Sequence, residues 1–174
     1  MAYGTTLRLI AKLARRSPGA ASPSVLPSLF KRLGHAREQT EALAMEDLIW
    51  SVWMAHPNDE AAEVLDRATG DIAARRYDIA ETRLMRLIRA CPTYAEAWHK
   101  LGTLHYLLGA DDESVSNLHR ALEIEPRHFG ALASVGEILL ARSDSEGAAL
   151  AFHSALKLHP HLATVRARME AIRN

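Results

Sequence analysis

Histidine has the most evident capacity for chemistry in this chain, because nine imidazoles in 174 residues could bind a metal or transfer protons. A zinc site needs three or four ligands around one ion. His119 and His153 lie 34 residues apart, which in a stack of helix pairs separates them by about one pair, too far to share an ion. His159 and His161 flank a proline, with no Cys, Asp or Glu close in sequence. The spacing therefore predicts structural or solvated histidines and no metal site.

The candidate nucleophiles also lack the partners that catalysis needs. Cys91 is the single cysteine, and no His or acid identifiable in the sequence would activate it. A lone cysteine excludes an internal disulfide and fits a reducing compartment. Ser28 and Lys31 match the S-x-x-K pattern by letters only, and the sequence has no glycine-rich phosphate loop. We expect neither enzymatic activity nor a cofactor.

The elements that position the histidines and the candidate nucleophiles follow a sequence repeat of 34 residues. Pro92, Pro126 and Pro160 are spaced by that interval, and each closes a stretch in which small and large apolar residues recur at matching offsets. Such a period indicates stacked helix pairs, in which Gly102 and Gly136 let two helices approach closely. The middle copy carries Trp98, Leu101, Gly102, Ser114, Leu118, Ala121 and Pro126, and the next carries Leu132, Val135, Gly136, Ala148, Phe152, Ala155 and Pro160.

These residues occupy the positions of W-x2-L-G-x2-Y, then A-x3-F, then A and P, so the chain closely resembles the tetratricopeptide repeat family. The resemblance covers roughly 110 residues, about three copies of the motif. It implies an all-α, right-handed solenoid of about three helix pairs, with an extra N-terminal helix and a C-terminal capping helix.

The resemblance also sets the expected domain organisation. Residues 1–36 form a basic leader or arm and a Pro/Ser linker, residues 37–60 an N-terminal helix on the repeats, and residues 61–174 the repeat domain. The copies span 61–94, 95–128 and 129–162, followed by a cap at 163–174. The first copy is degenerate, because Arg67 and Asp71 stand where apolar residues are expected and the apolar stripe of its first helix runs one position late.

Charge divides the chain into two unlike parts. Residues 1–37 hold seven basic residues and no acid, and the remaining 14 basic and 21 acidic residues give the body a charge of −7. A body of this charge is a poor general binder of nucleic acid, since phosphate contacts dominate such affinity. No apolar run approaches the roughly 18 residues of a membrane span.

The basic beginning of the chain is typical of an organelle transit peptide. Residues 5–16 can form an amphipathic helix, and the following Ser-, Pro- and Ala-rich stretch contains no acid. The interpretation predicts a protein of the mitochondrial matrix, with the plastid stroma or the cytoplasm as alternatives. In a second interpretation the segment is retained as an arm that contacts RNA or another subunit through its basic side chains, Arg8, Lys12, Arg15 and Arg16.

Two tryptophans mark the helix predicted at residues 37–56. Trp50 and Trp53 carry too much apolar area to leave in water. The helix either caps the first repeat, or one of the tryptophans inserts as an anchor into a partner or into the groove of the chain itself.

In the tetratricopeptide family the first helix of each pair lines a concave groove, and the resemblance assigns that role to ten positions here. These are Glu96, His99, Thr103, Tyr106 and Leu107 in the middle copy, and Gly130, Ala133, Glu137, Leu140 and Ala141 in the next. The mostly apolar lining predicts a protein or peptide with apolar anchors. The basic and Asn residues with which family members clamp the acidic tails of chaperones are absent, so no carboxylate clamp is expected. Alternatively, the groove is filled by the protein's own N-terminal helix.

A second basic surface is expected on the second helix of the first copy. Arg83, Arg86 and Arg89 follow one another at three-residue intervals and could contact an acidic protein or RNA, although such a stripe is also typical of a solvated outer face. The sequence as a whole predicts a non-enzymatic scaffold or adaptor. The alternative is a permanent accessory subunit of an organellar ribosome or respiratory complex, anchored by its basic arm.

Overall fold

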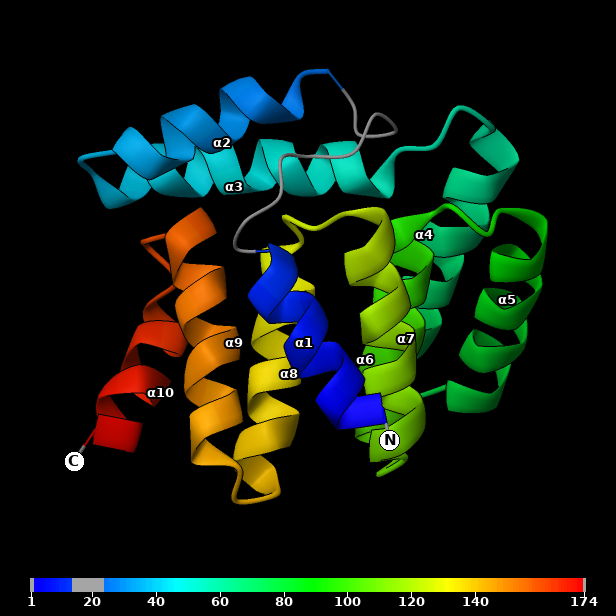
Figure 1. The fold of residues 1–174 in the computed structure, drawn as a ribbon. Helices are drawn as coiled ribbons and strands as arrows, with labels where there is room; N and C mark the ends of the chain where they lie inside the picture. Colours follow the sequence, from blue (N-terminus) through cyan, green and yellow to red (C-terminus); the bar gives the residue numbers. More distant parts are fainter. Residues whose placement is uncertain (1, 14–23, 174) are drawn as a thin grey trace.

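The fold is given by a computed structural model, which describes residues 2–13 and 24–173. These residues form helices and no strand, and the later helices stand side by side in a row (Figure 1). The predicted all-α solenoid of helix pairs is confirmed. The helices are α1 (Ala2–Leu13), α2 (Leu26–His35), α3 (Gln39–Met54), α4 (Asp59–Ala73), α5 (Tyr77–Ala90), α6 (Ala95–Leu107), α7 (Asp111–Ile124), α8 (Phe129–Ala141), α9 (Ser145–Leu158) and α10 (Ala163–Arg173).

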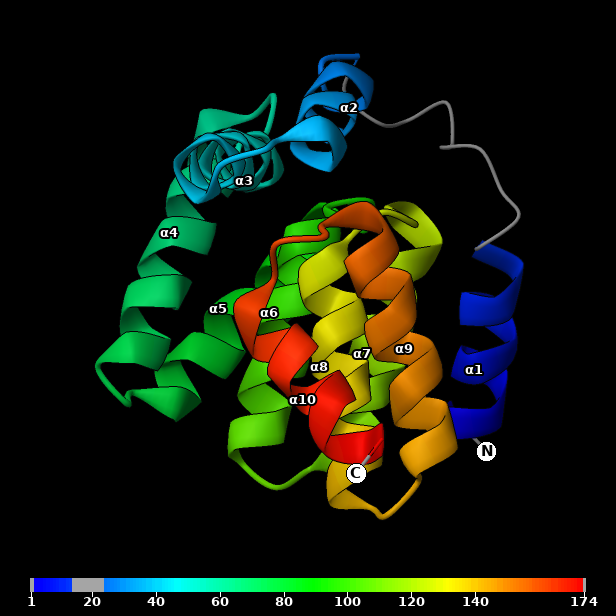
Figure 2. The ribbon, with the colours of Figure 1, turned by 90° about the vertical axis from the view of Figure 1, so that its left-hand side faces the viewer.

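Helices α4 to α9 pair in sequence order, as the 34-residue period predicts. The pairs are α4 with α5, α6 with α7 and α8 with α9, and α10 covers the end of the row against α9. Helices α2 and α3 do not continue the row. They form a hairpin that lies across the ends of the stacked helices (Figure 2). None of the described helices combines the length and the hydropathy required to cross a bilayer.

Small residues allow the helices within a pair to pack closely. A Cβ atom on Gly136 would lie 2.4 Å from Cε1 of Phe152, and one on Gly102 would lie 2.8 Å from Cγ of Leu118. The buried hydroxyl of Ser114 donates to the carbonyl of Gly102 at 2.7 Å. The repeated pattern of glycine facing a large apolar residue is therefore a packing requirement, as expected.

The first pair replaces part of the apolar pattern with a buried ion pair. Asp71 is almost fully buried. Its Oδ1 lies 2.7 Å from Nη2 of Arg76, and its Oδ2 lies 2.7 Å from Nε of Arg83. Hydrogen bonds from Arg76 and Arg83 hold the pKa of Asp71 below its ordinary value. Of the predicted basic stripe, Arg83 thus pairs within the chain, whereas Arg86 and Arg89 are exposed.

Helix α1 packs against α7 and α9, on the side of the stack opposite α6 and α10 (Figure 2). Ile10 is fully buried, and Thr6 lies 3.1 Å from Nδ1 of His119. Arg8 and Lys12 are exposed on the outer side, as the amphipathic pattern predicts. Arg15 and Arg16 lie outside the described residues.

Helix α2 falls within the stretch that the sequence analysis assigned to the linker. Its leucines Leu26, Leu29 and Leu33 are buried against the core. Pro27 stands in the first turn, where a proline is compatible with a helix because the first amides have no intrahelical partner. The proline and serine content of this segment therefore did not indicate its structure.

The turn inside each helix pair places a residue in the left-handed region. The φ angles are 58° at Arg75, 73° at Gly109 and 63° at Ser143, so the same position recurs every 34 residues. At Arg75 the turn is closed by amides of residues 75 and 76, which donate to the carbonyls of Ile72 and Asp71. Only the middle turn has the glycine that this geometry favours.

We predict that Arg75→Gly and Ser143→Gly each raise the free energy of unfolding by roughly 0.5–1 kcal/mol, because a side chain in this conformation is strained. Urea unfolding measures the effect. Gly109→Ala is the matched reversal and should lower the stability by about 1 kcal/mol. Unchanged stability in all three variants would contradict the assignment of strain to these turns.

Candidate functional site

The groove face is the surface formed by the ten positions of α6 and α8 that the resemblance assigned to partner binding. The structure divides it into a covered end and an open end. At the covered end Glu96 is 0% exposed and His99 6% exposed. At the open end Tyr106 is 40% and Leu107 51% exposed. The remaining positions are partly or fully exposed: Thr103, Gly130, Ala133, Glu137, Leu140 and Ala141.

Trp50 of α3 closes the covered end. Its ring stacks on His99, with centroids 5.9 Å apart, and its edge meets Phe129 at 5.4 Å. A Cβ atom on Gly130 would lie only 2.7 Å from Cη2 of Trp50, so glycine is needed there. The protein's own N-terminal helix therefore occupies part of the predicted groove.

Trp53 fixes α3 from the inside. It is buried and stacks on His128, with centroids 4.2 Å apart and planes 10° from parallel. The hydroxyl of Tyr94 donates to the carbonyl of Met54, at the end of α3. In this structure both tryptophans are thus anchors within the chain, and α3 is part of the main hydrophobic core.

A buried carboxylate lies directly beneath the two tryptophans. One oxygen of Glu96 lies 3.1 Å from Nζ of Lys100 and 3.3 Å from Nδ1 of His99, and the other lies 2.7 Å from Nε2 of His128. Burial alone would raise the pKa of Glu96, but His99 and His128 hold it well below its ordinary value. Burial lowers the pKa of His99 to about 4, so this ring is neutral at pH 7. The cluster is therefore an ionised carboxylate held by Lys100 and two histidines.

The hydrogen-bond pattern assigns the tautomer of His128. The amide of Ala131 donates to Nδ1 of His128 at 3.1 Å, where the ring caps α8. Since Nδ1 accepts, Nε2 carries the proton and donates to Glu96. The ring thus links the start of α8 to the start of α6.

Glu96, His99 and His128 also bring ligand atoms within 4.8 Å of one another, a distance at which three groups could surround a metal ion. A metal on Nε2 of His128 would require a proton on Nδ1, which would then face the amide of Ala131. The ammonium of Lys100 would lie beside the ion as well. This donor set fits a hydrogen-bond network better than a metal site.

The histidine spacings in the sequence do not single out this cluster. Glu96 and His128 lie 32 residues apart, close to the repeat period, so the stacking of α6 and α8 brings the two helix starts together. The 32-residue offset is the feature of the sequence that indicates contact between Glu96 and His128. The offset does not reveal that α3 covers these two residues.

Histidines join the α2–α3 hairpin to the last helix pair as well. Nε2 of His159 lies 2.9 Å from Glu46, which also accepts from the indole of Trp50 at 3.3 Å. Nε2 of His161 donates to the carbonyl of Ala36 at 3.1 Å. The histidines on both sides of Pro160 therefore hold the hairpin in place.

We predict that Zn²⁺ does not raise the thermal midpoint of the protein, because the proton on Nε2 of His128 and the charge of Lys100 oppose metal binding. Differential scanning fluorimetry with and without Zn²⁺ and a chelator measures this. A midpoint that rises with Zn²⁺, and loses that rise in Glu96→Gln, would contradict the assignment.

We also predict that stability falls as the pH drops from 6.5 towards 4. The pKa of His99 is about 4 in the folded protein and 6.5 in the unfolded chain, so the unfolded state binds more protons in this window. The loss between pH 6.5 and 5 is about 2 kcal/mol. Urea unfolding at each pH measures it, with His99→Gln as the control that keeps a hydrogen-bond donor without titrating. An equal slope in His99→Gln would rule out His99 as the source.

Comparison with known proteins agrees with this geometry. No family model matches the chain. A TPR repeat-containing protein of Rhizobium etli is 27% identical over 146 residues, which cover 84% of this chain and 72% of the relative. The chain is similar to this tetratricopeptide repeat protein.

Solved structures share the tetratricopeptide repeat fold at low identity. The type III secretion chaperone SycD of Yersinia enterocolitica, in complex with a peptide of the translocator YopD, has a TM-score of 0.62 at 15% identity and covers 67% of this chain and 94% of its own. The Sgt2 TPR domain of Aspergillus fumigatus has a TM-score of 0.62 at 15% identity, with coverages of 69% and 80%. MamA has a TM-score of 0.60 at 13% identity and covers 97% of this chain and 81% of its own.

Proposed function

We propose that this protein is a non-enzymatic scaffold that binds a segment of another protein at the open end of the groove face. The observation that carries the proposal is the exposure of Tyr106 and Leu107 at the end of α6. Large apolar side chains that stand together in water at family binding positions indicate a surface that a partner covers.

The open end favours apolar anchors over a charged ligand. Leu140 is partly exposed on α8, where the groove-face positions 133 and 141 carry the small side chains of Ala133 and Ala141. Glu137, the acid of this region, is paired with Arg168 of α10 at 3.0 Å. Because that charge is already satisfied, affinity at this end depends on apolar contact. The structural neighbour SycD is in complex with a peptide, which supports a peptide segment as the ligand.

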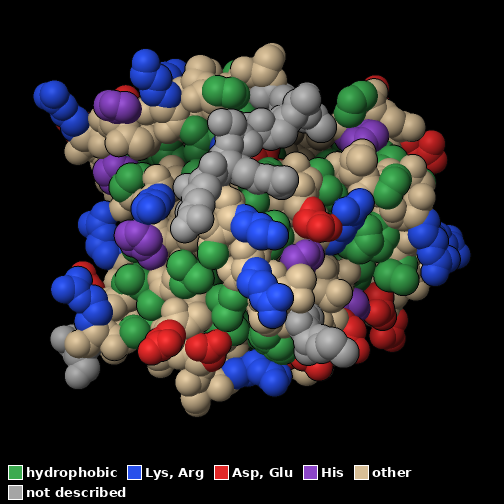
Figure 3. All heavy atoms as spheres, in the orientation of Figure 1, with side chains coloured by type: hydrophobic (Ala, Val, Ile, Leu, Met, Phe, Trp, Pro, Cys, Tyr) green, Lys and Arg blue, Asp and Glu red, His purple; other side chains and the backbone are tan. Residues whose placement is uncertain are grey.

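The packing of α1 bears on the choice between leader and arm. An apolar face buried against α7 and α9 supports a segment that stays attached as part of the protein. As an alternative, we propose that the exposed Arg8 and Lys12 contact RNA or another subunit of a ribosome or respiratory complex. Figure 3 shows the side of the molecule on which α1 lies, and basic and acidic side chains are intermixed there. This mixture supports contacts with protein more than contacts with nucleic acid. A location in the mitochondrial matrix or plastid stroma stays a prediction.

Peptides selected from a random display library on the wild-type protein test the proposal. We predict that Leu107→Asp combined with Leu140→Asp weakens binding of these peptides by at least roughly 100-fold, since two lost leucine contacts cost about 3 kcal/mol or more. Fluorescence polarisation measures the affinity, and circular dichroism checks that helicity is kept.

Leu150→Asp is the matched control, because Leu150 is exposed on α9 and outside the groove face. Peptides that share apolar residues, bind the control as well as the wild type and lose affinity for the double variant support the proposal. Peptides that bind all three proteins equally place the binding surface elsewhere and overturn it.

A further inference from the structure

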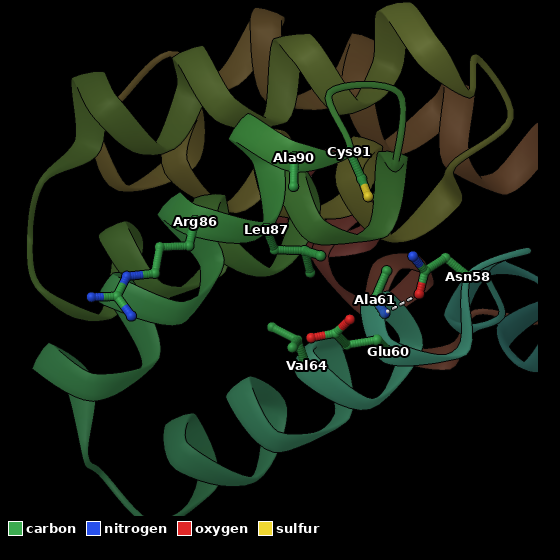
Figure 4. A pocket seen from close by; sticks show the side chains of 8 residues that line it. All are labelled: Asn58, Glu60, Ala61, Val64, Arg86, Leu87, Ala90 and Cys91. Carbon is green, nitrogen blue, oxygen red and sulfur yellow. Dashed lines mark hydrogen bonds between the residues drawn. The ribbon is translucent and has the colours of Figure 1, made fainter.

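The outer face of the first helix pair carries a shallow pocket with a volume of about 230 Å³. Its floor is apolar, formed by Ala61 and Val64 of α4 with Leu87 and Ala90 of α5 (Figure 4). This is the side of the pair on which a preceding pair would stack in a longer solenoid. Helix α3 crosses the ends of the stack and does not cover it.

Opposite charges stand on the two sides of this pocket. Glu60 lines it from the start of α4, and Arg86 lines it from the second half of α5. In Figure 4 the carboxylate of Glu60 lies beside Val64 at the pocket, whereas the guanidinium of Arg86 extends away from it. Among the described residues no salt bridge engages either of them, whereas neighbours such as Glu63 and Arg83 are paired. The pocket is therefore dipolar, with an unpaired acid on one helix and an unpaired base on the other.

The charge division extends along both helices. The beginning of α4 adds Asp59 to Glu60, and the end of α5 adds Arg89 to Arg86. Because the two helices are antiparallel, the acidic beginning of α4 lies beside the basic end of α5. The acidic stripe argues against RNA as the occupant, since it would repel phosphates that approached the arginines.

A two-fold axis parallel to the helices makes such a face complementary to itself. It sets α4 of one copy opposite α5 of the other, with matching ends at the same height, so each Glu60 faces the other copy's Arg86 and the apolar floors meet between them. The same operation pairs the acidic and basic stripes twice. A face with charges of one sign would instead repel its copy.

We propose that this outer face of α4 and α5 is a self-association surface, and that its occupant is a second copy of the same chain. The dimer is isologous, held by two Glu60–Arg86 ion pairs around an apolar centre. This surface is distinct from the groove face, so dimerisation leaves Tyr106 and Leu107 free.

Sedimentation velocity across a concentration series of the full chain tests the proposal. The wild type should show a concentration-dependent dimer whose dissociation constant rises with salt. Glu60→Arg and Arg86→Glu, each alone, should raise that constant at least tenfold, because like charges then meet twice. An equimolar mixture of the two single variants should form dimers again, since every opposed pair is then acid with base.

Glu170→Arg on α10 is the matched control, as it makes the same change of charge on an exposed position at the other end of the stack. Recovery of the dimer in the mixture cannot arise from a folding defect. The proposal is overturned if the wild type is a monomer at all concentrations. It is equally overturned if the single variants dimerise like the wild type, or if the mixture stays monomeric.

Discussion

The structure depends on one buried charge, the carboxylate of Glu96. Removing a carboxylate from water costs several kcal/mol unless its oxygens are fully engaged. Lys100, His99 and His128 supply the ammonium and the two imidazoles that make this burial possible. Trp50 and Trp53 then close over the imidazoles. The position of α3 is thus set by a polar network that is stable only when every member is present.

That position decides which surfaces are left for partners. Because α3 covers His99 and packs against Gly130, the most exposed part of the groove face is the end that holds Tyr106 and Leu107. Because α3 lies across the stack instead of beside α4, the outer face of the first pair stays open with its dipolar pocket. An N-terminal helix stacked beside α4 would instead have left the whole groove face open and covered the outer face of the first pair. The α2–α3 hairpin therefore shortens the exposed groove face and leaves the outer face of α4 and α5 uncovered.

The repeats were predictable because their packing is local and periodic. The proline spacing and the glycines at 102 and 136 follow from contacts between neighbouring helices. The cluster around Glu96 needs three elements at once, and no short pattern connects Trp50 with His128. Helix α2 was missed because its proline and serine suggested a linker, although Leu26, Leu29 and Leu33 recur at helical spacing. In the first copy, Asp71 departs from the apolar pattern because Arg76 and Arg83 neutralise it.

The same division between local and distant contacts suggests an order of assembly. Helix pairs form from residues within one repeat, which costs little loop entropy. The contact of Thr6 with His119 and that of Glu46 with His159 each join residues 113 positions apart. Such contacts contribute to stability only after the stack has formed, because α7 and α9 must already be in place. We therefore expect the groove face to form along its whole length before α3 closes one end, so that the polar network around Glu96 determines how much of it stays open.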